Sequence, residues 1–117
     1  MAQGVKQAGK QLRPHAKAHK CVEIARRQIA HGASGISVAT VAEAELMAHN
    51  GIAGILLTSP IADPSKMARI GAIGAMAVVD HVTQVTWFEE AAAEPIDLLI
   101  DLDVGDHRTG ASTATQA

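Results

Sequence analysis

One short segment near the start of the chain gathers side chains that could do chemistry. In residues 13–20, which read RPHAKAHK, the two-residue period of a strand places four side chains on one face: Arg13, His15, Lys17 and His19. The alanines between them would pack against helices, so the cationic face would point into a cleft or a barrel. There, burial and neighbouring positive charge favour the neutral form of the Lys17 amine. A neutral amine is the nucleophile that imine formation with an aldehyde requires; the alternative interpretation is a basic edge strand in contact with solvent.

The same segment holds two weaker candidates. His15 and His19 have the spacing that binds a metal on a helix, but Pro14 and the strand interpretation weaken that geometry, so we predict no metal site here. Cys21 could act as a nucleophile, but nothing in the sequence fixes a base beside it. We therefore expect Cys21 to be a buried, inert residue at the end of the strand.

A second segment combines carboxylates with an arginine. Apolar residues alternate along residues 97–105, so Asp101 and Asp103 can face inward together. Paired carboxylates suit acid–base chemistry, but salt bridges to nearby cations favour a structural network instead. Residues 105–110 form the loop after this strand, on the face where parallel α/β folds bind ligands, and Arg108 is its natural contact for an anion. The alternative for Arg108 is a solvated loop side chain.

The elements that must position these residues follow a repeating pattern of a short apolar run and a helical stretch. Strands are expected over residues 12–20, 36–39, 55–58, 76–80 and 96–104. Helices are expected between them, with Thr40 and Asp63 as N-caps. The first helix is expected over residues 22–31, and the last carries Val82, Val85 and Phe88 on one face. Five strands with four intervening helices, in units of about twenty residues, are typical of a parallel α/β sheet with right-handed crossovers.

Two complete folds could contain this pattern. One is a doubly wound sheet, and the other is a closed (β/α)8 barrel of roughly 250 residues, of which this chain would supply a part. Residues 1–9 are typical of the tail of a helix, whereas residues 112–117 are small, polar and of low complexity. We therefore expect a truncated chain, with one domain over residues 1–111 and a tail over residues 112–117.

Composition excludes several classes of protein. A length of 117 residues with 48% hydrophobic types and a net charge of −2 fits one globular domain, and the apolar runs are too short to cross a membrane. The aromatic residues are only Trp87 and Phe88, which disfavours nucleic-acid binding by base stacking. A single cysteine and the absence of a signal-peptide pattern predict the reducing cytoplasm.

Charge is distributed unevenly along the chain. Residues 1–27 contain seven Lys and Arg and one acidic residue, whereas residues 80–106 contain eight carboxylates and neither Lys nor Arg. The functional interpretation of the basic start is a phosphate or carboxylate site. The alternative is a solvated helix surface.

Three motifs together closely resemble the D-threonine aldolase and D-serine dehydratase family of pyridoxal-phosphate enzymes. They are LRPHAKAHK (residues 12–20), GISVATVAEAE (residues 35–45) and DLDVGDHRTG (residues 101–110), and the resemblance spans residues 1 to about 111. It implies the alanine-racemase type of fold, in which a (β/α)8 barrel carries the cofactor and a β domain follows. The predicted fold class is thus α/β, a partial (β/α)8 TIM barrel with about five parallel strands and four intervening helices.

The resemblance also implies a site and an activity. Lys17 would be the Schiff-base lysine, His15 would belong to the cofactor site, and Arg108 would lie near the phenolic oxygen of the cofactor ring. The implied reaction cleaves a D-3-hydroxy amino acid, such as D-threonine, to glycine and an aldehyde. Family members also use a divalent metal, whose ligands we do not find in this chain.

Several alternatives to this activity stay open. Dehydration of a D-hydroxy amino acid and racemisation of an amino acid are neighbouring reactions of the same cofactor. A non-catalytic pyridoxal-phosphate binder and an inactive truncated product are further alternatives. The expected partners are a small D-amino-acid substrate and a second copy in a homodimer, with neither nucleic acid nor membrane.

Overall fold

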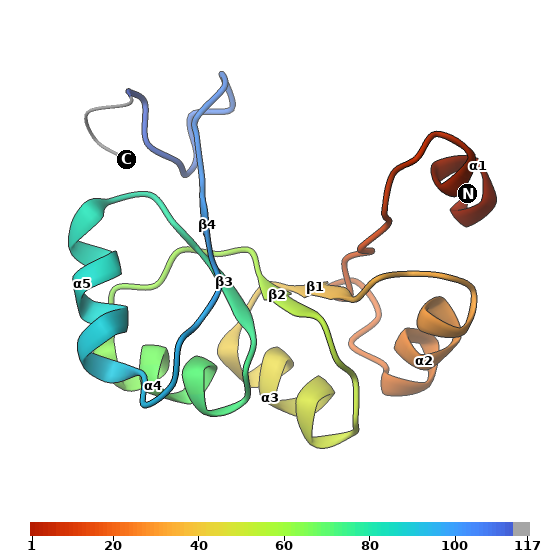
Figure 1. Ribbon diagram of the computed structural model, residues 1–117, viewed down its shortest axis with the longest axis horizontal. Helices are drawn as coiled ribbons and strands as arrows, with labels where there is room; N and C mark the ends of the chain where they lie inside the picture. Colours follow the sequence, from red (N-terminus) through yellow and green to blue (C-terminus); the bar gives the residue numbers. More distant parts are fainter. Residues whose placement is uncertain (114–117) are drawn as a thin grey trace.

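Four short parallel strands and five helices are present in residues 1–113, the part of the chain that the computed structural model describes. The strands are β1 (Ile36–Val38), β2 (Ile55–Leu57), β3 (Met76–Val79) and β4 (Leu98–Ile100). The helices are α1 (Ala2–Gln7), α2 (Val22–Ala30), α3 (Val41–His49), α4 (Pro64–Ala72) and α5 (Val82–Ala91). The sheet order is β1-β2-β3-β4, and every strand is parallel to its neighbour (Figure 1).

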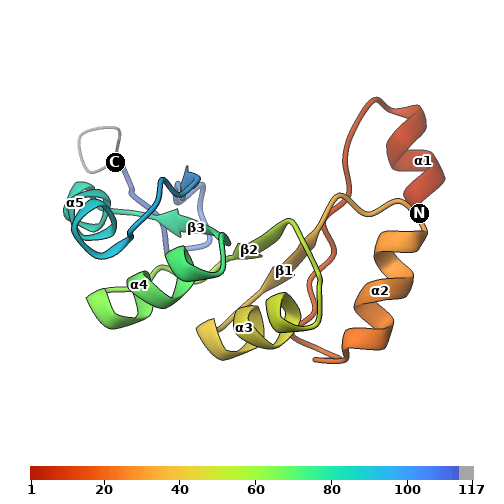
Figure 2. The same cartoon turned by 60° about the horizontal axis from the view of Figure 1, so that its bottom comes forward.

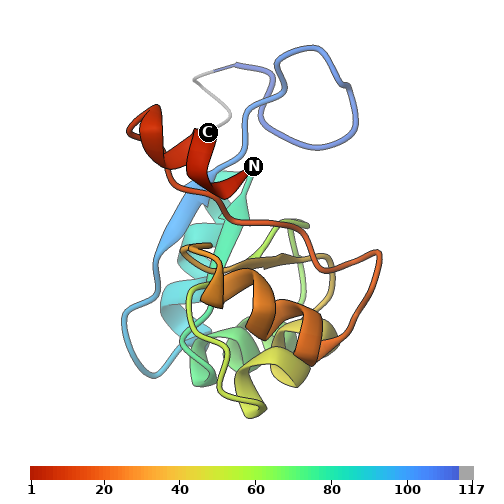
Figure 3. The same cartoon turned by 90° about the vertical axis from the view of Figure 1, so that its right-hand side faces the viewer.

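The helices α3, α4 and α5 lie along one side of the sheet, as Figures 1 and 2 show. The loop after β4 projects away from α3 and α4 (Figure 3). No helix within residues 1–113 is long and apolar enough to cross a membrane. This arrangement is that of a partial α/β barrel with its helices on the outside.

The first expected strand, over residues 12–20, is wrong for most of its length. Only His15 forms a parallel bridge, to Ser37 of β1, and the chain turns over residues 17–19. Pro14 has no N–H to extend a ladder, and Lys20 adopts a φ of 49°, in the left-handed region. The two-residue alternation that we predicted therefore ends before Lys17, and four strands are present in the described residues where five were expected.

The other elements are close to those expected. The strands predicted over residues 36–39, 55–58 and 76–80 are confirmed as β1, β2 and β3, and the four intervening helices are confirmed as α2 to α5. The strand predicted over residues 96–104 is shorter, because β4 covers three residues and is followed only by a bridge between Leu102 and Ala111. Of the predicted tail, residues 114–117 lie outside the described residues.

Polar side chains fix where three helices begin. Thr40 accepts a hydrogen bond from the Glu43 N–H at the start of α3, and Asp63 accepts one from the Ser65 N–H at the start of α4, as predicted. The imidazole of His81 caps α5 by accepting from the Thr83 N–H. This last cap was not predicted from the sequence, because histidine is not among the preferred N-cap types.

The core lies between the sheet and the helices. Its largest fully buried side chains come from two strands and three helices: Ile36, Val38, Met47, Leu57, Met67, Ile70 and Phe88. Gly35 and Gly54 allow β1 and β2 to meet, because a Cβ at Gly35 would overlap the carbonyl oxygen of Gly54. The Ile36 N–H donates to that same carbonyl at 3.2 Å, so the close approach of the two backbones sets the register of the first pair of strands.

Glu43 joins the first turn of α3 to the chain before α2. Its side chain is 9% exposed, and its carboxylate accepts a hydrogen bond from the Ala39 N–H at 2.9 Å and pairs with the Lys20 ammonium at 3.1 Å. Burial opposes ionisation, but the hydrogen bonds from Ala39 and Lys20 prevail and hold the pKa of Glu43 below its ordinary value. The ion pair therefore stabilises the turn that carries Lys17 toward α2.

We expect Ile70→Val to destabilise the fold modestly, because Ile70 is fully buried against the sheet. Loss of one buried methylene should lower the free energy of unfolding by about 0.5–1.5 kcal/mol, measured by urea denaturation. The matched control is Ile24→Val, because Ile24 is 42% exposed. A control effect as large as that of Ile70→Val would contradict the packing described here.

Glu43→Gln should destabilise the chain at pH 7 and much less in acid. At pH 7 the loss should be about 1.5–3 kcal/mol, since hydrogen bonds to a charged group are removed. A carboxyl with a lowered folded pKa contributes stability above its ordinary pKa of 4.5, and this contribution is lost as the pH falls through the folded value. Urea denaturation from pH 7 down to pH 3 measures the difference between the two proteins, with Glu89→Gln as an exposed control. A difference that is constant with pH would contradict the ion pair.

Candidate active site

The carboxyl ends of the strands bring several polar residues to one edge of the sheet. Thr58 directly follows β2, and Asp80 and Asp101 directly follow β3 and β4. His15 reaches the same edge from outside the sheet, because its neighbours Pro14 and Ala16 exchange backbone hydrogen bonds with Ser37, each at 2.8 Å. In parallel α/β folds this edge is where ligands bind.

A chain of hydrogen bonds fixes the ring of His15. The Lys17 backbone N–H donates to His15 Nδ1 at 3.2 Å, so Nδ1 is an acceptor. His15 Nε2 lies 3.1 Å from Thr58 Oγ1, and the Thr58 hydroxyl donates in turn to the Val38 carbonyl at 3.0 Å. The network therefore assigns the proton of the neutral imidazole to Nε2, which donates to Thr58.

The environment of His15 favours this neutral ring. Burial lowers the pKa of His15 below 6.5, and the positive charge of Lys17 lowers it further, against a smaller opposing effect of Glu43. At neutral pH the imidazole is accordingly uncharged. It adds no second positive charge beside the Lys17 amine.

The Lys17 side chain is exposed, unlike the buried amine that the strand interpretation predicted. Within residues 1–113 its amine has neither a hydrogen bond nor an ion pair, whereas Lys20 pairs with Glu43 and Lys66 pairs with Asp63. Lys17 thus has a free amine at the carboxyl edge of the sheet. It begins the turn over residues 17–19, and the ion pair of Lys20 with Glu43 stabilises the chain directly after that turn. An arrangement of this kind is able to react with an aldehyde or bind an anion.

The four residues predicted to share one face are not all together. His15 and Lys17 are neighbours at the sheet edge. Arg13 is half-buried, with Nε packed near Gly35, and His19 accepts a hydrogen bond from the Cys21 N–H through Nδ1. The turn over residues 17–19 ends the predicted alternation, so His19 does not continue the face of His15 and Lys17.

Arg108 lies apart from His15 and Lys17. Its guanidinium is exposed, 4.0 Å from the Asp106 carboxylate, and within the described residues no contact joins it to Lys17. The role that the resemblance implies for Arg108 therefore stays a prediction. The conformation of the loop that carries Arg108 is held by Asp103.

Asp103 organises that loop. Its carboxylate accepts hydrogen bonds from the backbone N–H groups of His107 and Gly105 and pairs with His107 Nδ1 at 2.8 Å. The backbone N–H of His107 contributes most, and together these bonds hold the pKa of Asp103 below its ordinary value. Asp103 is thus part of a structural network, as expected, although its partner is His107 and not an arginine. His107 was not predicted from the sequence, in which its four-residue spacing from Asp103 is its only signal.

No metal centre is present in residues 1–113, where no group of three or more His, Cys, Asp and Glu side chains lies close enough to hold an ion. Cys21 is a free, half-buried thiol. The divalent metal that the resemblance implies stays a prediction.

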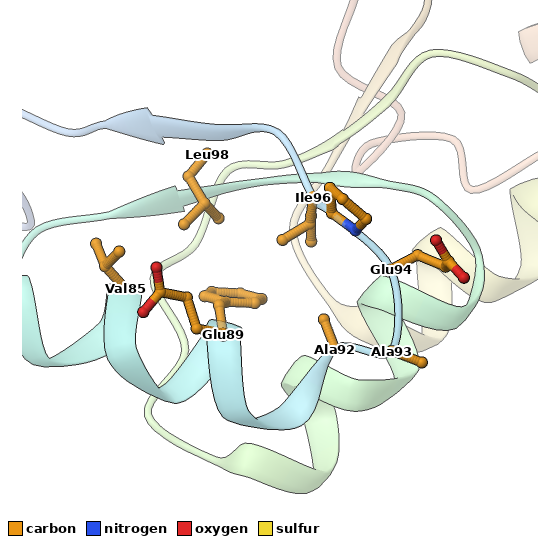
Figure 4. Close-up of a pocket in the computed structure, with 9 residues that line it drawn as sticks. Val85, Glu89, Ala92, Ala93, Glu94, Ile96 and Leu98 are labelled. Carbon is orange, nitrogen blue, oxygen red and sulfur yellow. The ribbon is translucent and has the colours of Figure 1, made fainter.

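A pocket of about 490 Å³ lies away from Lys17, between α5 and β4. Figure 4 shows Val85, Ile96 and Leu98 turned toward one another across it, with Glu89 on the α5 side. It lies at the start of β4, on the opposite edge of the sheet from Thr58 and Asp80. We therefore do not assign it to the same site as Lys17.

Comparison with known proteins identifies relatives of this chain. It is 40% identical over 108 residues to a D-threonine aldolase of an Arthrobacter species, covering 86% of this chain and 28% of that enzyme. It is 31% identical to a 3-hydroxy-D-aspartate aldolase of Paracoccus denitrificans, covering 97% of this chain and 32% of the relative. It is 33% identical to a D-threo-3-hydroxyaspartate dehydratase of a Delftia species, covering 94% and 31%.

Solved structures agree with these relatives. The D-threonine aldolase of Filomicrobium marinum matches 95% of this chain and 32% of its own with a TM-score of 0.91 and 35% identity. The alanine racemase of E. faecalis matches 98% of this chain and 34% of its own with a TM-score of 0.81 and 25% identity.

The chain spans about a third of the length of these relatives. The expected alanine-racemase type of fold is confirmed, as a partial α/β barrel. The pattern of the alanine racemase N-terminal domain matches residues 1–117, so the chain belongs to that family.

Proposed function

We propose that this chain is the cofactor-attachment part of a pyridoxal-phosphate-dependent lyase that acts on D-3-hydroxy amino acids. The observation that carries the proposal is the free Lys17 amine beside a neutral His15 at the carboxyl edge of the sheet. Its similarity to two aldolases, one for D-threonine and one for 3-hydroxy-D-aspartate, supports the reaction and the class of substrate. We place the activity in the cytoplasm, in keeping with a single free cysteine.

The residues present fit an aldehyde cofactor. Attachment of an aldehyde needs an accessible amine that no carboxylate holds, and Lys17 meets both conditions among the described residues. His15 would border the same cofactor, and we assign Arg108 to its phenolic oxygen as the resemblance implies. When bound, pyridoxal phosphate supplies an electron sink for the pair of electrons left at Cα when a bond to that carbon breaks.

The protein's own residues set the position of the Lys17 amine and the charge of the ring beside it. The bridge between His15 and Ser37 places the Lys17 backbone level with the end of β1. Thr58 holds the His15 ring through Nε2, which leaves no ring nitrogen free to take the proton of the amine.

The bond that breaks distinguishes the alternatives. An aldolase breaks Cα–Cβ of the D-3-hydroxy amino acid, removes the hydroxyl proton and releases glycine and an aldehyde. The 33% identity to a dehydratase favours a second candidate, in which the hydroxyl leaves as water and a 2-oxo acid and ammonia result. Product analysis with D-threonine separates these two from racemisation, which changes only the configuration at Cα, and from binding without turnover.

We expect pyridoxal phosphate to form a borohydride-reducible adduct at Lys17. The unpaired amine should react before lysines that are held by carboxylates. Intact mass and a peptide map of the reduced protein measure the adduct, and Lys17→Ala should abolish it. The matched control is Lys66→Ala, which removes another exposed lysine at the carboxyl edge and should leave the adduct unchanged. Adducts scattered over many lysines, and insensitive to Lys17→Ala, would contradict the proposed attachment site.

His15 should titrate below its ordinary pKa of 6.5, and two variants should move it in opposite directions. Lys17→Met removes a positive charge and should raise the pKa of His15. Glu43→Gln removes the negative charge that opposes the shift and should lower the pKa further. NMR titration of the imidazole nitrogens measures both changes and also reports whether the proton lies on Nε2. A titration unaffected by either variant would show that His15 does not lie beside these two charges.

A further inference from the structure

Thr58 contacts the ring of His15 from the other side of β1. Val38 ends β1 and pairs in register with Leu57, so Thr58 follows directly at the carboxyl end of β2. The segment that carries His15 lies along the opposite edge of β1, where His15 bridges to Ser37. The contact of 3.1 Å between His15 Nε2 and Thr58 Oγ1 therefore crosses the end of β1 and joins two separate units of the fold.

The direction of the hydrogen bonds around this contact is fixed at both ends. The backbone N–H and the hydroxyl of Thr58 both donate to the Val38 carbonyl at 3.0 Å. A hydroxyl has one proton, so Thr58 Oγ1 meets His15 as an acceptor. At the other end, His15 Nδ1 accepts from the Lys17 N–H at 3.2 Å, so the one proton of the neutral ring lies on Nε2. Donors and acceptors therefore match at every step from Lys17 to Val38.

The hydroxyl of Thr58 is what favours this tautomer of His15. Without the hydroxyl, a proton on Nε2 would leave the half-buried ring with an unsatisfied donor. A proton moved to Nδ1 would face the Lys17 N–H, and the hydrogen bond between the ring and the Lys17 backbone would be lost. The hydrogen bond of the Lys17 N–H therefore depends on a hydroxyl group from the next strand of the sheet.

The hydrogen bond to His15 fixes Lys17 at the point where the chain leaves β1. Ala16 is still held on β1, and its carbonyl accepts from the N–H groups of His19 and Lys20 at 3.1 and 2.8 Å. These bonds close the turn, but none of them uses the Lys17 N–H. The peptide plane before Lys17, and with it the direction in which the side chain leaves the backbone, is therefore set by His15 Nδ1.

We propose that Thr58 is a positioning residue for Lys17, which it holds through the ring of His15. The inference rests on the proposed function for its effect on the reaction of the amine, whereas the hydrogen bonds are testable on the chain alone. Because the hydroxyl and not the methyl group of Thr58 bonds to the ring, serine should replace Thr58 and valine should not.

NMR of the isotope-labelled chain tests the hydrogen bonds without a cofactor, at about pH 8, where the imidazole is neutral. Wild-type His15 should have its proton on Nε2, and Thr58→Val should move the proton to Nδ1 or divide it between the two nitrogens. Hydrogen exchange of the Lys17 N–H should become about three- to tenfold faster, the factor that loss of one neutral hydrogen bond gives. Thr58→Ser should restore both signals.

The matched control is Thr86→Val, because Thr86 of α5 is exposed, and it should change neither signal. Circular dichroism checks that each variant is folded. If Thr58→Val is unfolded, Thr58→Ala takes its place, since it removes the same hydroxyl without placing a methyl group against the ring.

A double-mutant cycle tests whether Thr58 acts through His15. His15→Ala should accelerate exchange of the Lys17 N–H at least as much as Thr58→Val does, because it removes the acceptor itself. In the His15→Ala background, Thr58→Val should have no further effect. Effects that multiply would mean that Thr58 acts on Lys17 by another route, and they would overturn the inference.

Reductive trapping with pyridoxal phosphate connects the inference to the proposed function. Lys17 of Thr58→Val should be modified about three- to tenfold more slowly than Lys17 of the wild type, whereas Thr58→Ser should match the wild type. Absence of a wild-type adduct at Lys17 would contradict the proposed function, and the NMR results would then decide the positioning role. A folded Thr58→Val chain with the wild-type tautomer, the wild-type exchange rate at Lys17 or the wild-type rate of trapping would overturn the inference.

Discussion

A pair of backbone hydrogen bonds to Ser37 fixes the position of the candidate site at the edge of the sheet. Ser37 accepts from the Ala16 N–H and donates to the Pro14 carbonyl, and both groups flank His15. The bonds hold the irregular segment around residues 14–16 against the edge of β1. They place Lys17 beside the carboxyl ends of the strands. The hydrogen bond between His15 and Thr58, the ion pair of Lys20 with Glu43 and the turn between them all depend on this docking. Without it, Lys17 would not be held beside the carboxyl ends of the strands.

Sequence was sufficient for the parts of the fold that local rules determine. Thr40 and Asp63 have the residue types that cap helices, and short apolar runs mark β1, β2 and β3, so these elements were predictable one by one. The turn after Ala16 was not predictable from alternation, because the same letters fit a strand. Its direction depends on Lys20 reaching Glu43, a contact between residues 23 positions apart.

The sequence likewise indicated some residues of the candidate site but not the contacts that orient them. The motif around Lys17 indicated the amine and its resemblance to a family, but the orientation of His15 depends on Thr58, which lies 43 positions away in a different unit of the fold. The order in the loop after β4 comes from Asp103 binding His107 and two backbone amides, which no composition rule signals. Contacts between polar side chains that are far apart in the sequence can be identified only in the structure. Many other polar residues of the chain could form the same hydrogen bonds.

The order of the strands has a consequence for how the chain folds. Every strand pairs with the next one in sequence, and paired residues such as Ile36 and Ile55 are only about twenty positions apart. Each crossover therefore closes a loop of similar, modest length, and the entropy cost of each closure is nearly the same. The sheet can grow by adding one strand and helix at a time from β1, with no step that must wait for the distant end of the chain. The four strands can therefore assemble in chain order, each on the one before it.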